Sequence, residues 1–240
     1  MRDSKLRTGV LYGVGIGPGD PELLTLKAVR ILKQVEVIAV PKSKEEAESK
    51  ALSIVQQAVD IKGKEILELV LPMTKEKEIL AKAREDVANL ICEKLKQGMD
   101  IACITLGDPL FYSTFSYFIP LITKVLPEIE VRVIPGVTSI NAVSSITLLP
   151  LAEADEKVAV IPATYEEKGL KEIIRNFDSI VLMKINKVMD KILTILEELD
   201  LKDKAVFISR AGWPDEVVVK DVESLRNKRL DYFSMIMIKK

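Results

Sequence analysis

The sequence predicts an α/β protein of two domains, and the spacing of its apolar runs is the main reason. In the N-terminal part, short apolar runs alternate with amphipathic stretches, which is typical of parallel strands buried on both faces. The predicted strands are Val10–Val14, Val35–Val40, Ile66–Leu71, Ile101–Leu106 and Val131–Ile134. We therefore expect a mainly parallel five-stranded sheet in the first domain.

The pattern restarts after Pro150 and predicts a second sheet of a different kind. Strand-like runs occur at Val158–Ile161, Ile180–Ile185, Ala205–Ser209, Val217–Val219 and Tyr232–Ile238, with helical segments around Lys171 and Leu193. The last two runs have no strong amphipathic helix between them, so this sheet should be mixed or partly antiparallel. We place the domains at residues 1–136 and 137–240, with the boundary near Gly136.

Two helices have recognisable ends. Apolar residues recur at helical spacing between Thr74 and Gly98, so we predict a helix there with Thr74 as N-cap and Gly98 as C-cap. A second helix is predicted to begin at Pro21, with Asp20 as its capping residue.

The amino-acid composition and charge argue against some classes of function. The 240 residues are 48% apolar and 30% charged, and the 35 basic and 36 acidic side chains leave a net charge of −1. Nucleic-acid binding is not expected, because there is no basic excess. No apolar run approaches the ~20 residues that span a bilayer, and no signal peptide is evident. We expect a cytoplasmic protein with no membrane partner.

The absence of histidine excludes several kinds of site at once. With no His in the chain, histidine acid/base catalysis, a Ser-His-Asp triad and most zinc sites are ruled out. Cys92 and Cys103 lie in apolar runs and are expected to be buried thiols. We expect no protein-bound metal.

A glycine-rich segment, Gly13–Asp20, follows the first predicted strand. Its four alternating glycines permit close backbone approach, and the helix N-terminus after it offers unpaired N–H groups, so the segment is typical of a binding loop. The dinucleotide pattern G-x-G-x-x-G fails, because Pro18 or Asp20 occupies its last position. A turn without a ligand remains an alternative.

Two further turns follow predicted strands of the same sheet. LGDPLFYST, Leu106–Thr114, comes after the fourth strand, and IPGVTS, Ile134–Ser139, after the fifth. Each could be a structural turn or a helix cap alone. Because the carboxyl ends of parallel strands share one edge of the sheet, we expect the three turns to lie together where ligands usually bind.

Together these segments resemble the tetrapyrrole methylase family, and the resemblance covers essentially the whole chain. Within it the sequence looks like the carbon-20 methyltransferases that act on precorrin-2. The matching segments are LPMT at Leu71–Thr74, LGDPLFYSTFSY at Leu106–Tyr117, IPGVTS at Ile134–Ser139 and PLAEADEKVAVIPA at Pro150–Ala163. Of these, LPMT and the YSTFSY extension are the specific part, whereas the glycine-rich loop is shared by the whole family.

The resemblance implies an S-adenosylmethionine (SAM) dependent methyltransferase of cobalamin biosynthesis, with the cofactor in a cleft between the domains and the tetrapyrrole beside it. A homodimer is the usual state in the family. Carried over by position, the implied cofactor contacts are Pro18, Leu106, Gly107, Asp108, Phe111, Thr138, Ser139, Met183 and Gly212.

The catalytic and substrate groups are less well defined by the sequence. Uroporphyrinogen methyltransferases carry an aspartate, proposed as a base, where this chain has Pro41. Tyr112 is our substitute as an acid/base or orienting group, with simple aromatic packing as the alternative. Because a precorrin carries several acid side chains, we expect cationic or hydroxyl groups to meet them. The candidates are Lys42, Ser43, Ser113 and Thr114.

Other functions stay open at this stage. The chain could methylate another corrin ring position, a modified histidine of an elongation factor or a ribosomal RNA ribose. It could also bind SAM without catalysis, whereas a pure interaction scaffold would leave the glycine turns without a purpose. The sequence leaves undecided whether the substrate contains cobalt.

Overall fold

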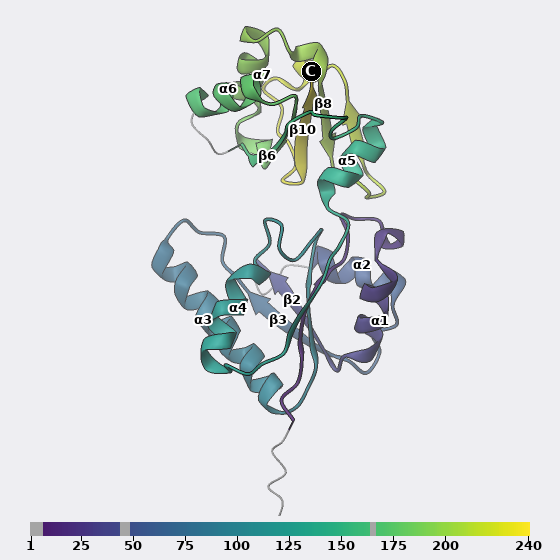
Figure 1. Ribbon diagram of the computed structural model, residues 1–240, viewed down its shortest axis with the longest axis vertical. Helices are drawn as coiled ribbons and strands as arrows, with labels where there is room; N and C mark the ends of the chain where they lie inside the picture. Colours follow the sequence, from purple (N-terminus) through teal and green to yellow (C-terminus); the bar gives the residue numbers. More distant parts are fainter. Residues whose placement is uncertain (1–6, 44–48, 164–166) are drawn as a thin grey trace, which may run out of the picture. The chain divides into compact units, whose positions relative to one another are not determined.

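The computed structural model describes residues 7–43, 49–163 and 167–240. The chain divides into two compact units, residues 1–138 and 139–240, and each is described by itself. Figure 1 shows both units coloured along the sequence.

The first unit is built on a parallel sheet in the order β3-β2-β4-β1-β5. The strands are β1 (Leu11–Gly15), β2 (Val37–Lys42), β3 (Glu65–Val70), β4 (Ile101–Thr105) and β5 (Val131–Ile134). All five residues of β1 are buried, because this strand lies between β4 and β5 and has helices on both faces. The predicted five-stranded parallel sheet is confirmed.

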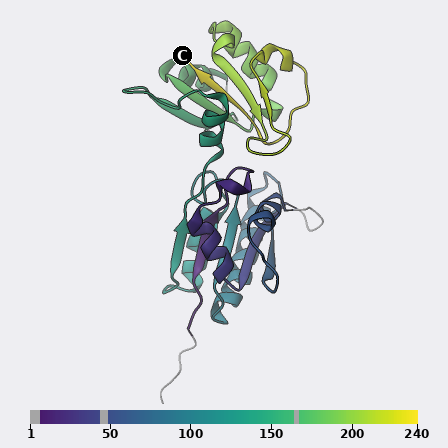
Figure 2. The ribbon, with the colours of Figure 1, turned by 90° about the vertical axis from the view of Figure 1, so that its right-hand side faces the viewer.

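Helices cover both faces of this sheet. They are α1 (Leu26–Gln34), α2 (Lys50–Ala58), α3 (Lys77–Lys96) and α4 (Phe115–Val125). Figure 1 shows α1 and α2 on one side and α3 and α4 on the other, and Figure 2 turns the strands toward the viewer. Apolar residues of α3 and α4, such as Ile91 and Phe118, pack with those of the strands in one core cluster.

The second unit contains a mixed sheet in the order β6-β7-β10-β8-β9. Its strands are β6 (Val158–Pro162), β7 (Ser179–Met183), β8 (Ala205–Ser209), β9 (Val217–Val219) and β10 (Ser234–Lys239). β6 and β7 are parallel, whereas β10 is antiparallel to both β7 and β8. The helices are α5 (Ser139–Thr147), α6 (Glu167–Asn176) and α7 (Met189–Glu198). The predicted mixed sheet is confirmed.

Both predicted helix starts were wrong by a few residues. After Asp20 the chain forms only a 3₁₀ turn, Pro21–Leu23, and α1 begins later, with the Thr25 hydroxyl accepting from Ala28 N at 3.1 Å. Similarly, the Thr74 hydroxyl accepts from Glu76 N within a turn, and α3 begins after Glu76. In each case a side chain that can cap a helix instead closes a local turn, an alternative open to Asp and Thr.

The end of α3 agrees better with expectation. Gly98 follows the last helical turn with φ +83° and donates from its N–H to Leu95 O at 3.0 Å. The left-handed conformation of this residue is typical of a glycine that ends a helix. No helix among the described residues is long and apolar enough to cross a membrane.

Candidate functional site

The three glycine-bearing turns follow β1, β4 and β5, which are neighbours in the sheet. Gly107 N donates to Gly17 O at 2.8 Å, so the turn after β4 is bonded to the turn after β1. Gly107 has φ +68°, a conformation that strongly favours glycine. The expectation that the turns lie together is confirmed within this unit.

The third turn joins the other two through Asp108. One carboxylate oxygen of Asp108 accepts from Gly136 N at 3.1 Å, and the other accepts from Leu110 N at 2.9 Å. A β-carbon at Gly136 would lie 2.1 Å from Gly107 O and 2.8 Å from Gly15 Cα. Only a glycine fits there, because the other two turns occupy the space of a side chain.

Gly13, the first glycine of the motif, has a different role. A β-carbon at this position would lie 2.3 Å from the ring of Phe115, the first residue of α4. The missing side chain therefore lets a helix pack on β1. The sequence did not predict this role, because it depends on a residue from a distant segment.

The remaining predicted contacts of this unit surround the joined turns. Pro18 is buried in the first turn, and Leu106 and Phe111 are half-buried on either side of Asp108. Thr138 is half-buried as well, with its Cα 3.8 Å from where a β-carbon of Gly107 would be. The structure therefore brings this group of residues to one edge of the sheet.

Tyr112 occupies an unusual backbone position. Its φ is +50°, and its ring packs edge-on to Phe111 with 4.9 Å between centroids. Non-glycine residues in this region typically cost about 1–3 kcal/mol and cluster at functional sites. The residue is 51% exposed, so it is open to solvent.

The hydroxyl residues next to Tyr112 differ from one another. Ser113 Oγ lies 3.0 Å from Thr105 Oγ1 and accepts from Phe115 N at 3.2 Å, so this hydroxyl already holds the connection between β4 and α4. Thr114 is exposed at the start of α4 and makes no side-chain capping bond. The part played by Thr105 was missed by the sequence analysis, because a threonine at a strand end carries no distinctive pattern.

Lys42 and Ser43 lie at the carboxyl end of β2. Lys42 Nζ forms an ion pair of 2.6 Å with Glu68 Oε1 on β3, and the lysine side chain is only 11% exposed. Ser43 is exposed immediately after the strand. Pro41 is within β2 opposite Leu69.

Three predicted contacts belong to the second unit. Ser139 is the first residue of α5, and Met183 is the last residue of β7, half-buried and packed against the apolar cluster around Val181. Gly212 has φ +79° in the turn after β8, and its N–H donates to the Glu216 carboxylate at 2.7 Å. Ser139 thus begins a helix, Met183 ends a strand and Gly212 lies in a turn, and their contact with the cofactor stays a prediction.

The thiols and the acidic residues offer neither a nucleophile nor a metal centre. Burial raises the pKa of the Cys103 thiol on β4 to about 12, so it stays protonated at neutral pH. Cys92 on α3 is buried too, and both cysteines are free thiols. Within the described ranges, no cluster of three or more acidic or cysteine side chains could hold a metal ion.

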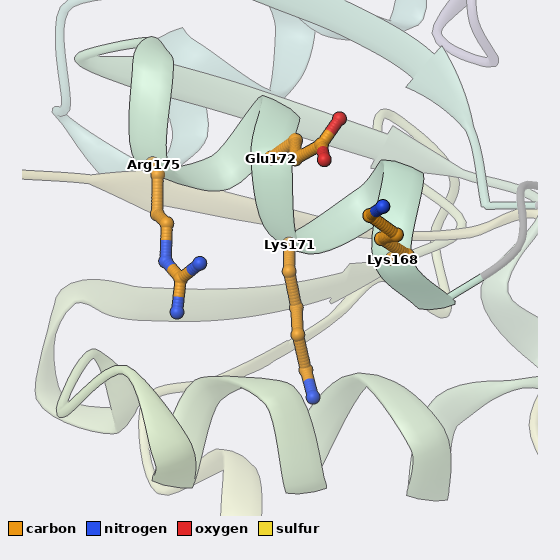
Figure 3. A pocket seen from close by; sticks show the side chains of 4 residues that line it. All are labelled: Lys168, Lys171, Glu172 and Arg175. Carbon is orange, nitrogen blue, oxygen red and sulfur yellow. The ribbon is translucent and has the colours of Figure 1, made fainter.

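A shallow groove on α6 is a different kind of feature. It is lined by Lys168, Lys171, Glu172 and Arg175, which Figure 3 shows projecting from one helix. Lys171 Nζ is paired with Glu198 on α7 at 2.5 Å. No strand end or glycine turn contributes to this groove, so we do not regard it as the site.

The family of the chain follows from comparison with known proteins. The profile of the Tetrapyrrole (Corrin/Porphyrin) Methylases matches residues 10–225, which include all three turns. The chain belongs to this family. The predicted resemblance is therefore confirmed.

Three relatives that match nearly the whole chain are named for methylation at carbon 20. A Methanocaldococcus jannaschii protein, described as a probable cobalt-precorrin-2 C(20)-methyltransferase, is 40% identical over 96% of both chains. The cobalt-precorrin-2 C(20)-methyltransferase of Salmonella typhimurium is 30% identical over 97% of both. The precorrin-2 C(20)-methyltransferase of a Sinorhizobium species is 29% identical over 98% of this chain and 97% of that protein.

Solved structures of tetrapyrrole methylases share the fold. A cobalt precorrin-4 methyltransferase superposes with a TM-score of 0.73 at 21% identity, covering 95% of this chain and 94% of that one. The uroporphyrin-III C-methyltransferase of Thermus thermophilus, complexed with S-adenyl homocysteine, gives 0.68 at 22% identity, covering 97% and 98%. At this level of identity the likeness supports the fold of two α/β units.

Proposed function

We propose that this methyltransferase transfers a methyl group from SAM to carbon 20 of precorrin-2 or of its cobalt complex, in cobalamin biosynthesis. The observation that carries the proposal is the 40% identity, over 96% of both chains, to a probable cobalt-precorrin-2 C(20)-methyltransferase. The two solved structures compared above are named for other substrates and are only 21% and 22% identical to this chain.

The joined turns fit the expected cofactor. SAM carries an amino acid group and a nucleoside, both of which need hydrogen-bonding partners and close backbone approach. Gly107 and Asp108 lie at the strand ends, where the backbones of the three turns approach closely. The residues around them are Pro18, Leu106, Phe111 and Thr138. We propose these six residues as cofactor contacts. Ser139, Met183 and Gly212 remain proposed contacts from the second unit.

The chemistry suits a protein that has no histidine. SAM supplies a methyl group on a sulfonium, whose departure leaves a neutral thioether. The meso carbon of a reduced tetrapyrrole is enamine-like and provides its own electron pair. The side chains must therefore mainly hold the carbon nucleophile in line with the methyl group, and such alignment can contribute about 7–11 kcal/mol.

Loss of a proton from the methylated carbon leaves a role for Tyr112. Its position beside the turn after β4 and its positive φ support it as the group that relays this proton, losing its own phenolic proton as it accepts one, or that orients the substrate. The conservative change Tyr112→Phe removes the hydroxyl and keeps the ring. We expect it to lower kcat by about 100-fold if the hydroxyl takes part in proton transfer. An unchanged kcat would leave Tyr112 only a packing role.

The proposed substrate contacts are Thr114, Ser43, Lys42 and Ser113. Thr114 and Ser43 are exposed, whereas Lys42 is paired with Glu68 and Ser113 holds the start of α4. Lys42→Ala tests the least supported of these four contacts, since the carboxylate of Glu68 already neutralises the lysine charge. An unchanged KM for the tetrapyrrole would remove Lys42 from the site.

The decisive test uses labelled SAM and precorrin-2, with and without cobalt, under anaerobic conditions. Label on carbon 20 is the expected result, and the preferred form of the substrate identifies the metal state. Label on another carbon would overturn the ring position and keep the methyltransferase class. Tight SAM binding without transfer to any corrinoid would favour a SAM-binding protein without this activity.

We also propose that the protein acts in the cytoplasm as a homodimer. The support is the family resemblance and the absence of a spanning helix among the described residues. Light scattering of the purified protein measures the assembly, and a mass of about 27 kDa would indicate a monomer.

A further inference from the structure

Arg84 of α3 reaches the connection that follows β4. Its guanidinium carbon lies 3.8 Å from the ring centroid of Tyr117 in the first turns of α4. Tyr117 N donates to Thr114 O at 3.1 Å, so the ring is one turn from a proposed substrate contact. α3 starts beyond the carboxyl end of β3, and Arg84 is in its first half. The stacked pair therefore lies toward the edge of the sheet that carries the glycine turns.

Arg84 is followed directly in the sequence by Glu85 and Asp86, but residues one and two positions apart on a helix do not face each other. The residues three and four positions away are uncharged around both members of the pair: Leu80, Ala81, Val87 and Ala88 on α3, and Ser113, Thr114, Pro120 and Leu121 around Tyr117. No carboxylate in the described part of the chain is paired with Arg84. Many other cations differ in this respect, as Lys42 and Lys94 show by pairing with Glu68 and Glu65.

Stacking fixes the guanidinium and leaves its hydrogen-bonding edge available. A ring beneath the plane contacts the face of the group, whereas the five N–H donors point outward within the plane. Such an edge matches the two oxygens of a carboxylate, and the stack reduces the side-chain entropy lost on binding. The aromatic partner also favours the positive charge, so the arginine is stable without an acidic partner.

We propose that Arg84, held by Tyr117, binds a carboxylate of the tetrapyrrole substrate. This inference rests on the proposed function, because precorrin-2 supplies the acid side chains. It also supplies a cation for those carboxylates, since Lys42, which was predicted to meet them, is already paired with Glu68. Arg84 is thus a substrate-binding residue that anchors the ring system next to the connection between β4 and α4.

The test compares Arg84→Ala with Arg84→Lys in steady-state methyl transfer to precorrin-2. We expect the alanine variant to raise KM for the tetrapyrrole by about tenfold or more, since a charge-assisted pair is lost. The lysine variant should fall between the alanine variant and the unmodified protein, because it keeps the charge without the planar fork. SAM affinity and kcat should change by less than about twofold. The rise of KM with salt should be weaker for the alanine variant than for the unmodified protein.

Lys82→Ala is the matched control. Lys82 is exposed on the same helix and carries the same charge, so its loss should leave KM unchanged. A KM for Arg84→Ala within about twofold of the unmodified value would overturn the inference, even if carbon 20 is the site of methylation. A raised KM with transfer to another carbon would support the inference and overturn the proposed ring position. Melting temperature separates a binding defect from a folding defect.

Discussion

Replacing Gly136 with alanine tests whether the three turns must touch. The new methyl carbon would lie 2.1 Å from Gly107 O, more than 1 Å inside the roughly 3.3 Å closest approach of carbon to a carbonyl oxygen. The atoms that the methyl carbon would meet belong to the backbone of Gly107 and of Gly15, so no side chain can rotate away. Overpacking typically costs about 1–3 kcal/mol. Loss of the bonds from Gly136 N to Asp108 and from Gly107 N to Gly17 O adds about 1 kcal/mol each.

We therefore expect Gly136→Ala to lose about 3–5 kcal/mol of folding free energy, which corresponds to a fall of about 10 °C in melting temperature. SAM affinity should fall at least about tenfold, because the backbone around Gly107 is displaced. Thermal unfolding followed by circular dichroism and titration calorimetry with SAM measure the two effects.

Two other glycines provide controls. Gly169 lies in α6 with open space around it, so Gly169→Ala should stabilise the protein by about 0.5–1 kcal/mol. Gly63 also has open space but φ +78°, so Gly63→Ala reports backbone strain without a clash, about 1–2 kcal/mol. Neither should alter SAM binding. If Gly136→Ala behaved like Gly169→Ala, the tight contact between the turns would be refuted.

Three further changes test other parts of the structure. Asp108→Asn places an amide N–H against the backbone N–H of either Gly136 or Leu110, so we expect a loss of about 1–2 kcal/mol in stability and weaker SAM binding by calorimetry. Tyr112→Gly should be about 1 kcal/mol more stable than Tyr112→Ala, because both lose the ring and only glycine relieves the positive φ, and equal stabilities would contradict the strain argument. Both changes should lower kcat. A hydrogen bond from Lys239 lowers the pKa of Glu156 below its usual value. Its stabilising effect is thus present above that value and is lost as pH falls through the folded-state pKa. The melting temperatures of Lys239→Met and the unmodified protein should therefore converge only in acid.

The sequence was sufficient to predict the sheets, because most of the strands are short apolar runs that the fold buries. β5 agreed at both ends, and the other strands of the first unit differed by one or two residues. The starts of the helices were harder, since Asp20 and Thr74 could cap a helix or close a turn with the same side chain. Whether such a side chain caps a helix or closes a turn depends on how the following residues pack.

The site was predicted in part. Glycines after three strands indicated where backbone would approach closely, and the order of the strands then placed those turns together. The clamp formed by Asp108, the packing of Phe115 on Gly13 and the stack of Arg84 on Tyr117 could not be predicted. Each joins residues that are distant in sequence and follows no repeating pattern.

By itself, the sequence determined the class of fold, the family and the positions of the turns, because periodicity and glycine placement are local properties of a chain. Only the tertiary structure decided which groups are already engaged. Lys42 is paired with Glu68, so it is not the unpaired cation that the sequence predicted. The Ser113 hydroxyl accepts a hydrogen bond at the start of α4. A hydrogen bond or ion pair depends on which segments the fold brings within a few ångströms, and that distance is not encoded in the spacing of either residue.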